Sequence, residues 1–328
     1  MTTNPIWVPA EEIEREVAGQ TVPKQFLEIV GNHPDLVLLR SMQGETPDAW
    51  NEWTAAEYAD LTARAAAGLR HHGLQADQRL LLFMRNRPDF HWFDAAAQFL
   101  RATPVSIYNS SSPEEIQYLA GHAEAEIAVV EDSGFLERIL KVRDELPQLQ
   151  RIFVIHPPAE ALPDGVHPAS DLLDHGRLDL AELAAATEPD DLATLIYTSG
   201  TTGPPKGVMI SQGNVVFTVE QLRRCFGMDR QEFPGKRLIS YLPMAHIAER
   251  MTSHYQGMVV GMQVTSCPDP TQVATYAREV HPEMMFGVPR VWEKVYLGVN
   301  AALSADPEKQ QKFEEGLAAA LEIKAAER

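Results

Sequence analysis

Residues 54–155 alternate between short apolar runs and longer stretches in which apolar residues recur every three or four positions. The apolar runs predict buried strands over 80–84, 104–107, 127–130 and 152–155. The periodic stretches predict helices from Thr54 to a stop at Gly73, from Pro88 to 100, from Ser112 to about 122, and over 135–146. Strands that alternate with helices of about ten residues are typical of crossover units in a mainly parallel sheet.

A second alternation of the same kind begins at residue 237. It predicts strands over 237–242 and 284–288, a short apolar segment from 264, and helices over 247–260 and 271–281. From Arg290 onward the pattern is mostly helical, with an interruption near Asp306 and Pro307. Between the two alternations, residues 156–176 are rich in Pro, Asp, His and Gly, which predicts a surface connection.

These patterns predict an α/β protein with two lobes, each a mainly parallel sheet covered by helices. We expect residues 1–52 to form an N-terminal arm and the edge of the second lobe. Residues 53–225 would form the first lobe, which ends in a glycine-rich loop, and residues 226–328 the second. A cleft between the lobes is the default ligand site.

Charge narrows the choice of ligands. The 328 residues contain 28 Lys and Arg against 46 Asp and Glu, a formal net charge of −18. Such a chain lacks the basic field that nucleic-acid binding normally needs, so nucleic-acid partners are not expected. An anionic ligand must therefore be held by local groups.

The sequence carries no predicted membrane span, because its longest apolar stretches fall far short of about 18 residues. The N-terminus has no signal-peptide pattern, and the two cysteines, Cys225 and Cys267, support neither a disulfide framework nor a cysteine metal site. No metal-ligating residues are predicted. We expect a soluble cytoplasmic protein, and peripheral contact with a membrane surface stays open.

The most informative segment is 197–207, Tyr-Thr-Ser-Gly-Thr-Thr-Gly-Pro-Pro-Lys-Gly. Glycines let backbone amides approach a phosphate closely, hydroxyls donate hydrogen bonds to it, and a lysine adds positive charge. Apolar residues on both sides predict that the loop joins two strands, with Ser211 or Asn214 opening the next helix. Gly207 stands where a Walker A loop has Ser or Thr, so this is not a Walker A loop. An ordinary Gly/Thr/Pro turn is disfavoured, because eleven ordered positions form the pattern.

Segment 197–207 resembles the phosphate-binding signature of the AMP-forming adenylate synthetases, a superfamily of acyl-CoA synthetases, luciferases and peptide-synthetase adenylation domains. Three further segments are similar to the long-chain fatty acyl-CoA synthetases of that superfamily: 241–250, Tyr-Leu-Pro-Met-Ala-His-Ile-Ala-Glu-Arg; 286–295, Phe-Gly-Val-Pro-Arg-Val-Trp-Glu-Lys-Val; and 102–109, Ala-Thr-Pro-Val-Ser-Ile-Tyr-Asn. The resemblance runs from about residue 53 to 296.

The resemblance implies that the protein uses ATP and Mg²⁺ to convert a fatty acid to an acyl-adenylate, from which coenzyme A then displaces AMP. It implies that the phosphates of ATP contact the loop residues Thr198, Ser199, Gly200, Thr201, Thr202, Gly203 and Lys206. His246 would lie near the carboxylate and the acyl tunnel as the catalytic residue. Val288 and Trp292 would line that tunnel, although Trp292 is equally plausible as a core residue. Glu249 and Arg250 are read either as a helix-surface pair or as substrate-facing groups.

Several positions depart from the family pattern. Gln212 stands where the long-chain branch usually has histidine, Arg101 where a glycine often follows the helix, and 76–79, Ala-Asp-Gln-Arg, replaces a Gly-Asp-Arg turn. After Met285 the sequence has no Tyr-Gly-x-Thr-Glu segment, no Thr-Gly-Asp, and no hinge or C-terminal lid with its lysine. The resemblance thus covers roughly the first half of a synthetase. An expression fragment, a natural truncation or split gene, and one part of a two-chain enzyme all fit.

Three functions remain open at this stage. The first is the N-terminal part of a long-chain fatty acyl-CoA synthetase, an enzyme by family but impaired as this chain alone, with a second chain as a candidate partner. The second is a non-catalytic nucleotide- or acyl-binding remnant. The third is an adenylating enzyme for another carboxylic acid, which the segments 241–250 and 286–295 disfavour.

Overall fold

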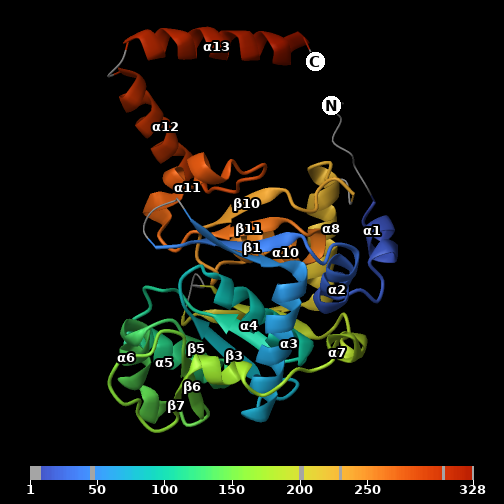
Figure 1. Ribbon diagram of the computed structural model, residues 1–328, viewed down its shortest axis with the longest axis vertical. Helices are drawn as coiled ribbons and strands as arrows, with labels where there is room; N and C mark the ends of the chain where they lie inside the picture. Colours follow the sequence, from blue (N-terminus) through green and yellow to red (C-terminus); the bar gives the residue numbers. More distant parts are fainter. Residues whose placement is uncertain (1–8, 45–48, 199–202, 229–230, 305–306, 327–328) are drawn as a thin grey trace. The chain divides into compact units, whose positions relative to one another are not determined.

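The computed structural model describes residues 9–44, 49–198, 203–228, 231–304 and 307–326. Its strands are β1 (Val37–Met42), β2 (Trp50–Thr54), β3 (Arg79–Phe83), β4 (Thr103–Ser106), β5 (Ala125–Val130), β6 (Arg151–Val154), β7 (Val166–Pro168), β8 (Leu192–Thr198), β9 (Lys206–Ser211), β10 (Arg237–Ser240) and β11 (Gln263–Ser266). These strands form two separate sheets (Figure 1).

The α-helices are α1 (Ala10–Glu16), α2 (Val22–Asn32), α3 (Ala55–His71), α4 (Pro88–Phe99), α5 (Pro113–His122), α6 (Ser133–Leu140), α7 (Leu180–Ala186), α8 (Gln212–Cys225), α9 (Ile247–Glu249), α10 (Tyr255–Val260), α11 (Val273–Val280), α12 (Pro289–Ser304) and α13 (Pro307–Ala326). Short 3₁₀ turns η1 (Arg143–Glu145), η2 (Ala169–Leu173) and η4 (Pro270–Gln272), and a π-helical turn η3 (Arg250–His254), complete the described elements.

The larger sheet has seven strands in the order β7-β6-β5-β3-β4-β8-β9, and only its edge strand β9 is antiparallel to its neighbour. Successive side chains of a strand point to opposite faces, and β3 shows the result. Leu80 and Leu82 pack in a core with α3 and α4, whereas Leu81 and Phe83 pack in a second core with α5 and α6. Helices thus cover both faces, as a parallel sheet requires.

The smaller sheet has the order β10-β11-β1-β2, with β10, β11 and β1 parallel and β2 antiparallel to β1. Strand β11 lies between β1, from the N-terminal part of the chain, and β10, which follows about 200 residues later. Two separate, mainly parallel sheets flanked by helices confirm the predicted fold class. The domain boundaries at 53 and 226 stay a prediction.

Most predicted elements occur within a few residues of their expected bounds, and three expectations were wrong. The connection over 156–176 contains strand β7 and turn η2. The strand expected over 284–288 is absent there, and only Met284 forms an isolated bridge, to Leu238. The helix expected over 135–146 ends at Leu140, and η1 follows.

The described residues divide into two compact units, one up to Met284 and the other from Met285 onward. The first holds both sheets. The described residues of the second are mostly the helices α12 and α13, and their exposed apolar side chains include Tyr296, Leu297 and Ile323. No helix in the described ranges has the length and apolar character to cross a membrane.

Candidate active site

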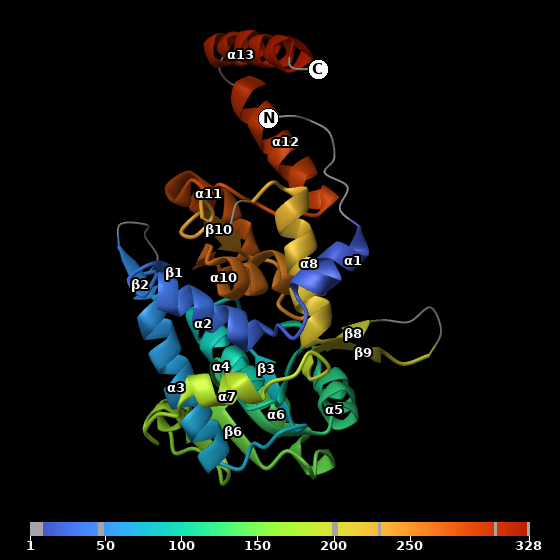
Figure 2. The ribbon, with the colours of Figure 1, turned by 90° about the vertical axis from the view of Figure 1, so that its right-hand side faces the viewer.

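The glycine-rich segment lies at the end of a β-hairpin, as the sequence predicted. Strands β8 and β9 pair antiparallel, and their last pair joins Thr198 to Lys206 (Figure 2). Both residues are exposed. Gly203, between them, has a φ of +85°, a conformation that favours glycine. The predicted contacts Ser199, Gly200, Thr201 and Thr202 lie outside the described residues.

Two side chains of α5 hold the base of this hairpin. The Tyr118 hydroxyl donates a 2.7 Å hydrogen bond to the carbonyl of Pro205, and His122 Nδ1 lies 2.9 Å from the Tyr197 hydroxyl. Burial raises the pKa of Tyr197 to about 12, so this hydroxyl keeps its proton at neutral pH. The two contacts attach α5 to Tyr197, near the end of β8, and to Pro205, just before β9.

Ser211 then opens α8. Its hydroxyl accepts a hydrogen bond from the Asn214 backbone amide, and the Asn214 side chain accepts one from the Ser211 amide. This reciprocal cap fixes the direction in which the chain leaves the hairpin. Of the two predicted helix openers, Ser211 is the cap.

His246 is an exposed residue at the start of α9. Its Nδ1 accepts a 3.1 Å hydrogen bond from the Ala248 backbone amide. This assigns Nδ1 as the unprotonated nitrogen, which leaves Nε2 as the N–H of the neutral ring. His246 therefore presents a hydrogen-bond donor to a ligand oxygen.

A cavity of about 700 Å³ brings His246 together with the hairpin. Its walls come from the loop between β4 and α5, from α5, from the end of β8, from Pro205 just before β9 and from the start of α9. The lining residues are Tyr108, Ser110, Ser111, Glu114, Glu115, Tyr118, Leu119, Ile196, Tyr197, Thr198, Pro205, His246 and Ile247. A cavity of this size, largely apolar with a few polar groups, is typical of small-molecule sites. Two predicted site residues far apart in the sequence, Thr198 and His246, thus line one space.

Glu249 and Arg250 are not a helix-surface pair, because both side chains are fully buried. Glu249 accepts hydrogen bonds from the Leu242 amide and the Ser253 hydroxyl. Burial raises the pKa of Glu249 to about 7. The hydrogen bonds from Leu242, Ser253 and Ser240 stabilise the charged carboxylate and therefore lower the pKa, but burial has the larger effect. The carboxyl group therefore titrates near neutral pH, three residues from His246.

Glu249→Gln should remove a pH dependence of stability. The folded chain holds the Glu249 proton up to about pH 7, whereas the ordinary pKa is 4.5, so folding favours the protonated form. Stability should therefore fall as pH rises from about 4.5 to 7, by up to about 3 kcal/mol, and the glutamine variant should lack that fall. Urea unfolding at several pH values measures it, with the exposed Glu160→Gln as control. Equal slopes for Glu249→Gln and the parent would contradict the assignment.

Arg250 pairs with Asp94 of α4, and both side chains are inaccessible to solvent. The Arg250 Nη1 to Asp94 Oδ2 distance is 2.6 Å, and His254 Nε2 donates to Asp94 Oδ1 at 2.9 Å. Burial by itself raises the pKa of Asp94, but the charges of Arg250 and His254 outweigh it and lower the value to about 2. Arg250 also donates to Ser106 Oγ of β4 and to the Met244 carbonyl.

Gln212, where histidine was expected, extends this buried network toward the N-terminal region. Its Nε2 donates to Gln98 Oε1 at 3.0 Å, and Gln98 donates to Asp94 at 2.6 Å. Its Oε1 accepts from the Val22 amide at the start of α2. The departure from the family pattern at Gln212 is therefore accommodated by hydrogen bonds in the core. Side-chain hydrogen bonds thus join α2, α8, α4 and η3.

The departure at Arg101 is also accommodated. Arg101 has a φ of +59°, the conformation for which glycine is usual. Its guanidinium forms two 2.8 Å hydrogen bonds with the Asp191 carboxylate, which stands just ahead of β8. This paired contact compensates part of the backbone cost.

Val288 and Trp292, the predicted acyl contacts, belong to the second unit. Val288 is 39% exposed and Trp292 is 46% exposed, so neither residue is buried in a hydrophobic core of the described structure. Trp292 Nε1 donates to the Gly287 carbonyl at 2.8 Å, which ties the start of α12 to the preceding turn. Their role in acyl binding stays a prediction.

A comparison with known protein families shows to which family the chain belongs. The AMP-binding enzyme family matches residues 26–324. The chain belongs to this family. The match covers both sheets and the cavity, and it confirms the resemblance drawn from segment 197–207.

Curated relatives of this AMP-binding enzyme are larger proteins. This chain is 31% identical over 282 residues to the human long-chain-fatty-acid–CoA ligase ACSBG1. The alignment covers 84% of this chain and 38% of that protein. The chain is 30% identical over 294 residues to the Drosophila melanogaster long-chain-fatty-acid–CoA ligase heimdall, covering 85% of this chain and 42% of that protein. The chain thus spans about two fifths of the length of these relatives.

Solved structures show the same fold. A long-chain-fatty-acid-CoA ligase from Archaeoglobus fulgidus has a TM-score of 0.71 at 20% identity, with 86% of this chain and 54% of that chain covered. The anthranilate CoA ligase AuaEII, solved with anthranoyl-AMP, has a TM-score of 0.70 at 18% identity, with 87% and 52% covered. The fold of this chain therefore corresponds to about half of each of these ligases.

The sequence analysis did not assign several cavity residues, among them Tyr118 and Tyr197, to the site, and it did not identify the partner of Arg250. The sequence does contain a signal for that partner, Asp94. Asp94 is the one acidic residue in the mostly apolar helical stretch 90–100, and a buried carboxylate needs a charged or hydrogen-bonding partner. Only the fold identifies that partner as a residue 156 positions away.

Proposed function

We propose that this AMP-binding enzyme is the N-terminal part of a long-chain fatty acyl-CoA synthetase. The reaction would be ATP-dependent conversion of a fatty acid to acyl-AMP, followed by transfer of the acyl group to coenzyme A. The observation that carries the proposal is the cavity lined by both Thr198, at the end of the phosphate-loop hairpin, and His246.

The proposed roles follow from the chemistry of each group. Thr198, the loop residues through Gly203, and Lys206 would hold the β- and γ-phosphates, which leave as pyrophosphate. His246 Nε2–H would donate to the fatty-acid carboxylate and orient it toward the α-phosphorus of ATP. Transfer of this kind depends mainly on positioning and on neutralising charge at the leaving oxygens.

The acyl chain would lie against apolar surface that includes Val288 and Trp292. Mg²⁺ would accompany ATP as in the family. The family's magnesium-holding glutamate belongs to a motif that residues 1–328 do not contain, so no residue here is assigned to the metal. A second chain that carries this motif and the lid is the proposed partner.

Lys206→Ala tests the phosphate assignment. Removal of a charge-assisted hydrogen bond should weaken ATP binding by about 1.5–3 kcal/mol. Isothermal titration calorimetry with ATP measures this change. Lys24→Ala is the matched control, because the Lys24 ammonium donates to the Gly19 carbonyl beside α2. Equal affinity of Lys206→Ala and the parent, under conditions where the parent binds measurably, would reject the assignment.

A further inference from the structure

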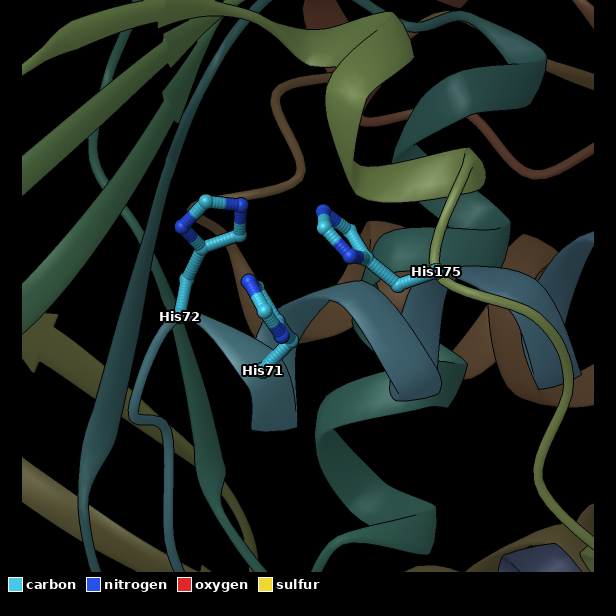
Figure 3. Close-up of side chains that lie close together, drawn as sticks. All are labelled: His71, His72 and His175. Carbon is cyan, nitrogen blue, oxygen red and sulfur yellow. The ribbon is translucent and has the colours of Figure 1, made fainter.

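Three histidines gather at the C-terminal end of α3, on elements that do not line the cavity described above (Figure 3). His71 is the last residue of α3 and His72 its C-cap, whereas His175 follows η2 about one hundred residues later. One nitrogen of each ring lies within 4.8 Å of the other two. The ring centroids of His72 and His175 are 5.1 Å apart, and His71 stacks on His175 at 3.9 Å.

A carboxylate faces two of these rings. Asp171 Oδ2 is 3.3 Å from His72 Nε2, and Asp171 Oδ1 is 3.8 Å from His175 Nε2. Both Nε2 atoms are shielded from solvent, yet neither has a hydrogen-bond partner among the described residues. Shielded polar atoms without a partner are rare in native proteins and call for an explanation such as a bound ion.

One distance in the cluster equals that between two ligands of a bound ion, and the three imidazole nitrogens lie within 4.8 Å of one another. Two ligand atoms that each lie about 2.0–2.1 Å from a tetrahedral zinc ion are roughly 3.3 Å apart, which is the distance between His72 Nε2 and Asp171 Oδ2.

We propose that His71, His72, His175 and Asp171 form a binding site for a divalent transition-metal ion of the zinc type. Three imidazoles and one carboxylate are a ligand set that suits this ion. His71 is exposed at a helix end, and binding by all three rings requires it to turn out of its stack with His175. Arg151, which donates to the His72 carbonyl at 2.7 Å, places a positive charge beside the cluster.

The scaffold beneath the site is tightly packed. A Cβ at Gly68 would come within 2.1 Å of the Leu172 carbonyl oxygen, so α3 and η2 are in direct backbone contact. Sites carried by such rigid elements hold their ligands more precisely than sites on loops. A bound ion would join the end of α3 to the chain that carries Asp171 and His175, and would stabilise that connection.

The test is titration of the metal-free 328-residue chain with Zn²⁺ by calorimetry and with Co²⁺ by visible absorption. We expect one saturable site and the intense absorption of four-coordinate Co²⁺. His175→Ala should weaken Zn²⁺ binding by at least tenfold, and Asp171→Asn by roughly 10–100-fold, the range for partners around a metal. Circular dichroism confirms that each variant is folded. His33→Ala, an exposed histidine at the end of α2, is the control and should bind as the parent does.

Limited proteolysis supplies a readout that does not depend on ligand spectra. Zn²⁺ should slow tryptic cleavage after the exposed Arg177 in the parent and leave the rate unchanged in His175→Ala. The proposal is overturned if the parent shows no saturable Zn²⁺ binding. It is equally overturned if His175→Ala and Asp171→Asn bind Zn²⁺ with the parent's affinity, because the metal would then sit elsewhere.

Discussion

Purified residues 1–328 should form palmitoyl-CoA at a rate at least about 10³-fold below that of a complete synthetase, because loss of a single charge-stabilising group costs about 10²–10³-fold. Residues 1–328 contain none of three groups that the family resemblance implies act together: the glutamate of Tyr-Gly-x-Thr-Glu for magnesium, the aspartate of Thr-Gly-Asp for the ribose, and the lid lysine. Groups that work as one constellation are strongly non-additive, so binding should survive and chemistry should not. The assay combines the chain with ATP, Mg²⁺, coenzyme A and palmitate.

The same assay separates the alternatives. Addition in trans of a polypeptide encoded downstream of Arg328 should restore product if the enzyme is made of two chains. The full-length human relative ACSBG1 serves as positive control for the assay conditions. Robust palmitoyl-CoA from residues 1–328 alone would contradict the prediction. Absence of product with both polypeptides present would favour a binding remnant.

Asp94→Asn should lower the free energy of unfolding by about 3–5 kcal/mol, the usual cost when one partner of a buried ion pair is removed. The Arg250 guanidinium would keep its charge with no access to solvent, and His254 would lose its carboxylate acceptor. Urea unfolding at pH 7, followed by fluorescence and circular dichroism, measures the change. The effect should shrink below pH 4, as the Asp94 carboxylate of the parent approaches its own pKa of about 2.

A matched pair on the surface provides the control. Arg278 and Glu279 form an exposed ion pair at 3.2 Å, and Glu279→Gln should change stability by less than about 0.5 kcal/mol. The double variant Asp94→Leu with Arg250→Met should be more stable than either single variant, because it leaves no unpaired buried charge. A loss below about 1 kcal/mol for Asp94→Asn would contradict the prediction that Asp94 compensates a buried charge on Arg250.

Much of the fold could be predicted because its signals are local. Thr54 with Glu57 and Ser112 with Glu115 each form the reciprocal cap that their spacing predicts, and both helices begin there. Strand β3 is apolar along most of its length because helices cover both faces of its sheet. In the same way, the hairpin that ends in segment 197–207 follows from apolar runs on either side of a glycine-rich turn.

Errors occurred where a segment's structure depends on distant partners. The stretch 156–176 has the composition of a loop, yet residues 166–168 extend the large sheet because β6 offers a free edge. Residues 284–288 have the composition of a strand, yet only Met284 meets a neighbour, Leu238. Whether a segment forms a strand depends on a free sheet edge nearby in space, and a short stretch of sequence does not reveal that edge.

The sequence by itself determined the family, most strands and helices, and the glycine-rich segment 197–207 between two strands, because each of these signals lies within a short run of consecutive residues. The tertiary structure alone decided that Glu249 and Arg250 are buried, that Thr198 and His246 line one cavity, and that three histidines meet at the end of α3. Each of these depends on which surfaces pack together across more than forty residues of chain. Burial and the distance to charged neighbours then determine the pKa of each buried ionisable side chain, and both depend on the folded structure.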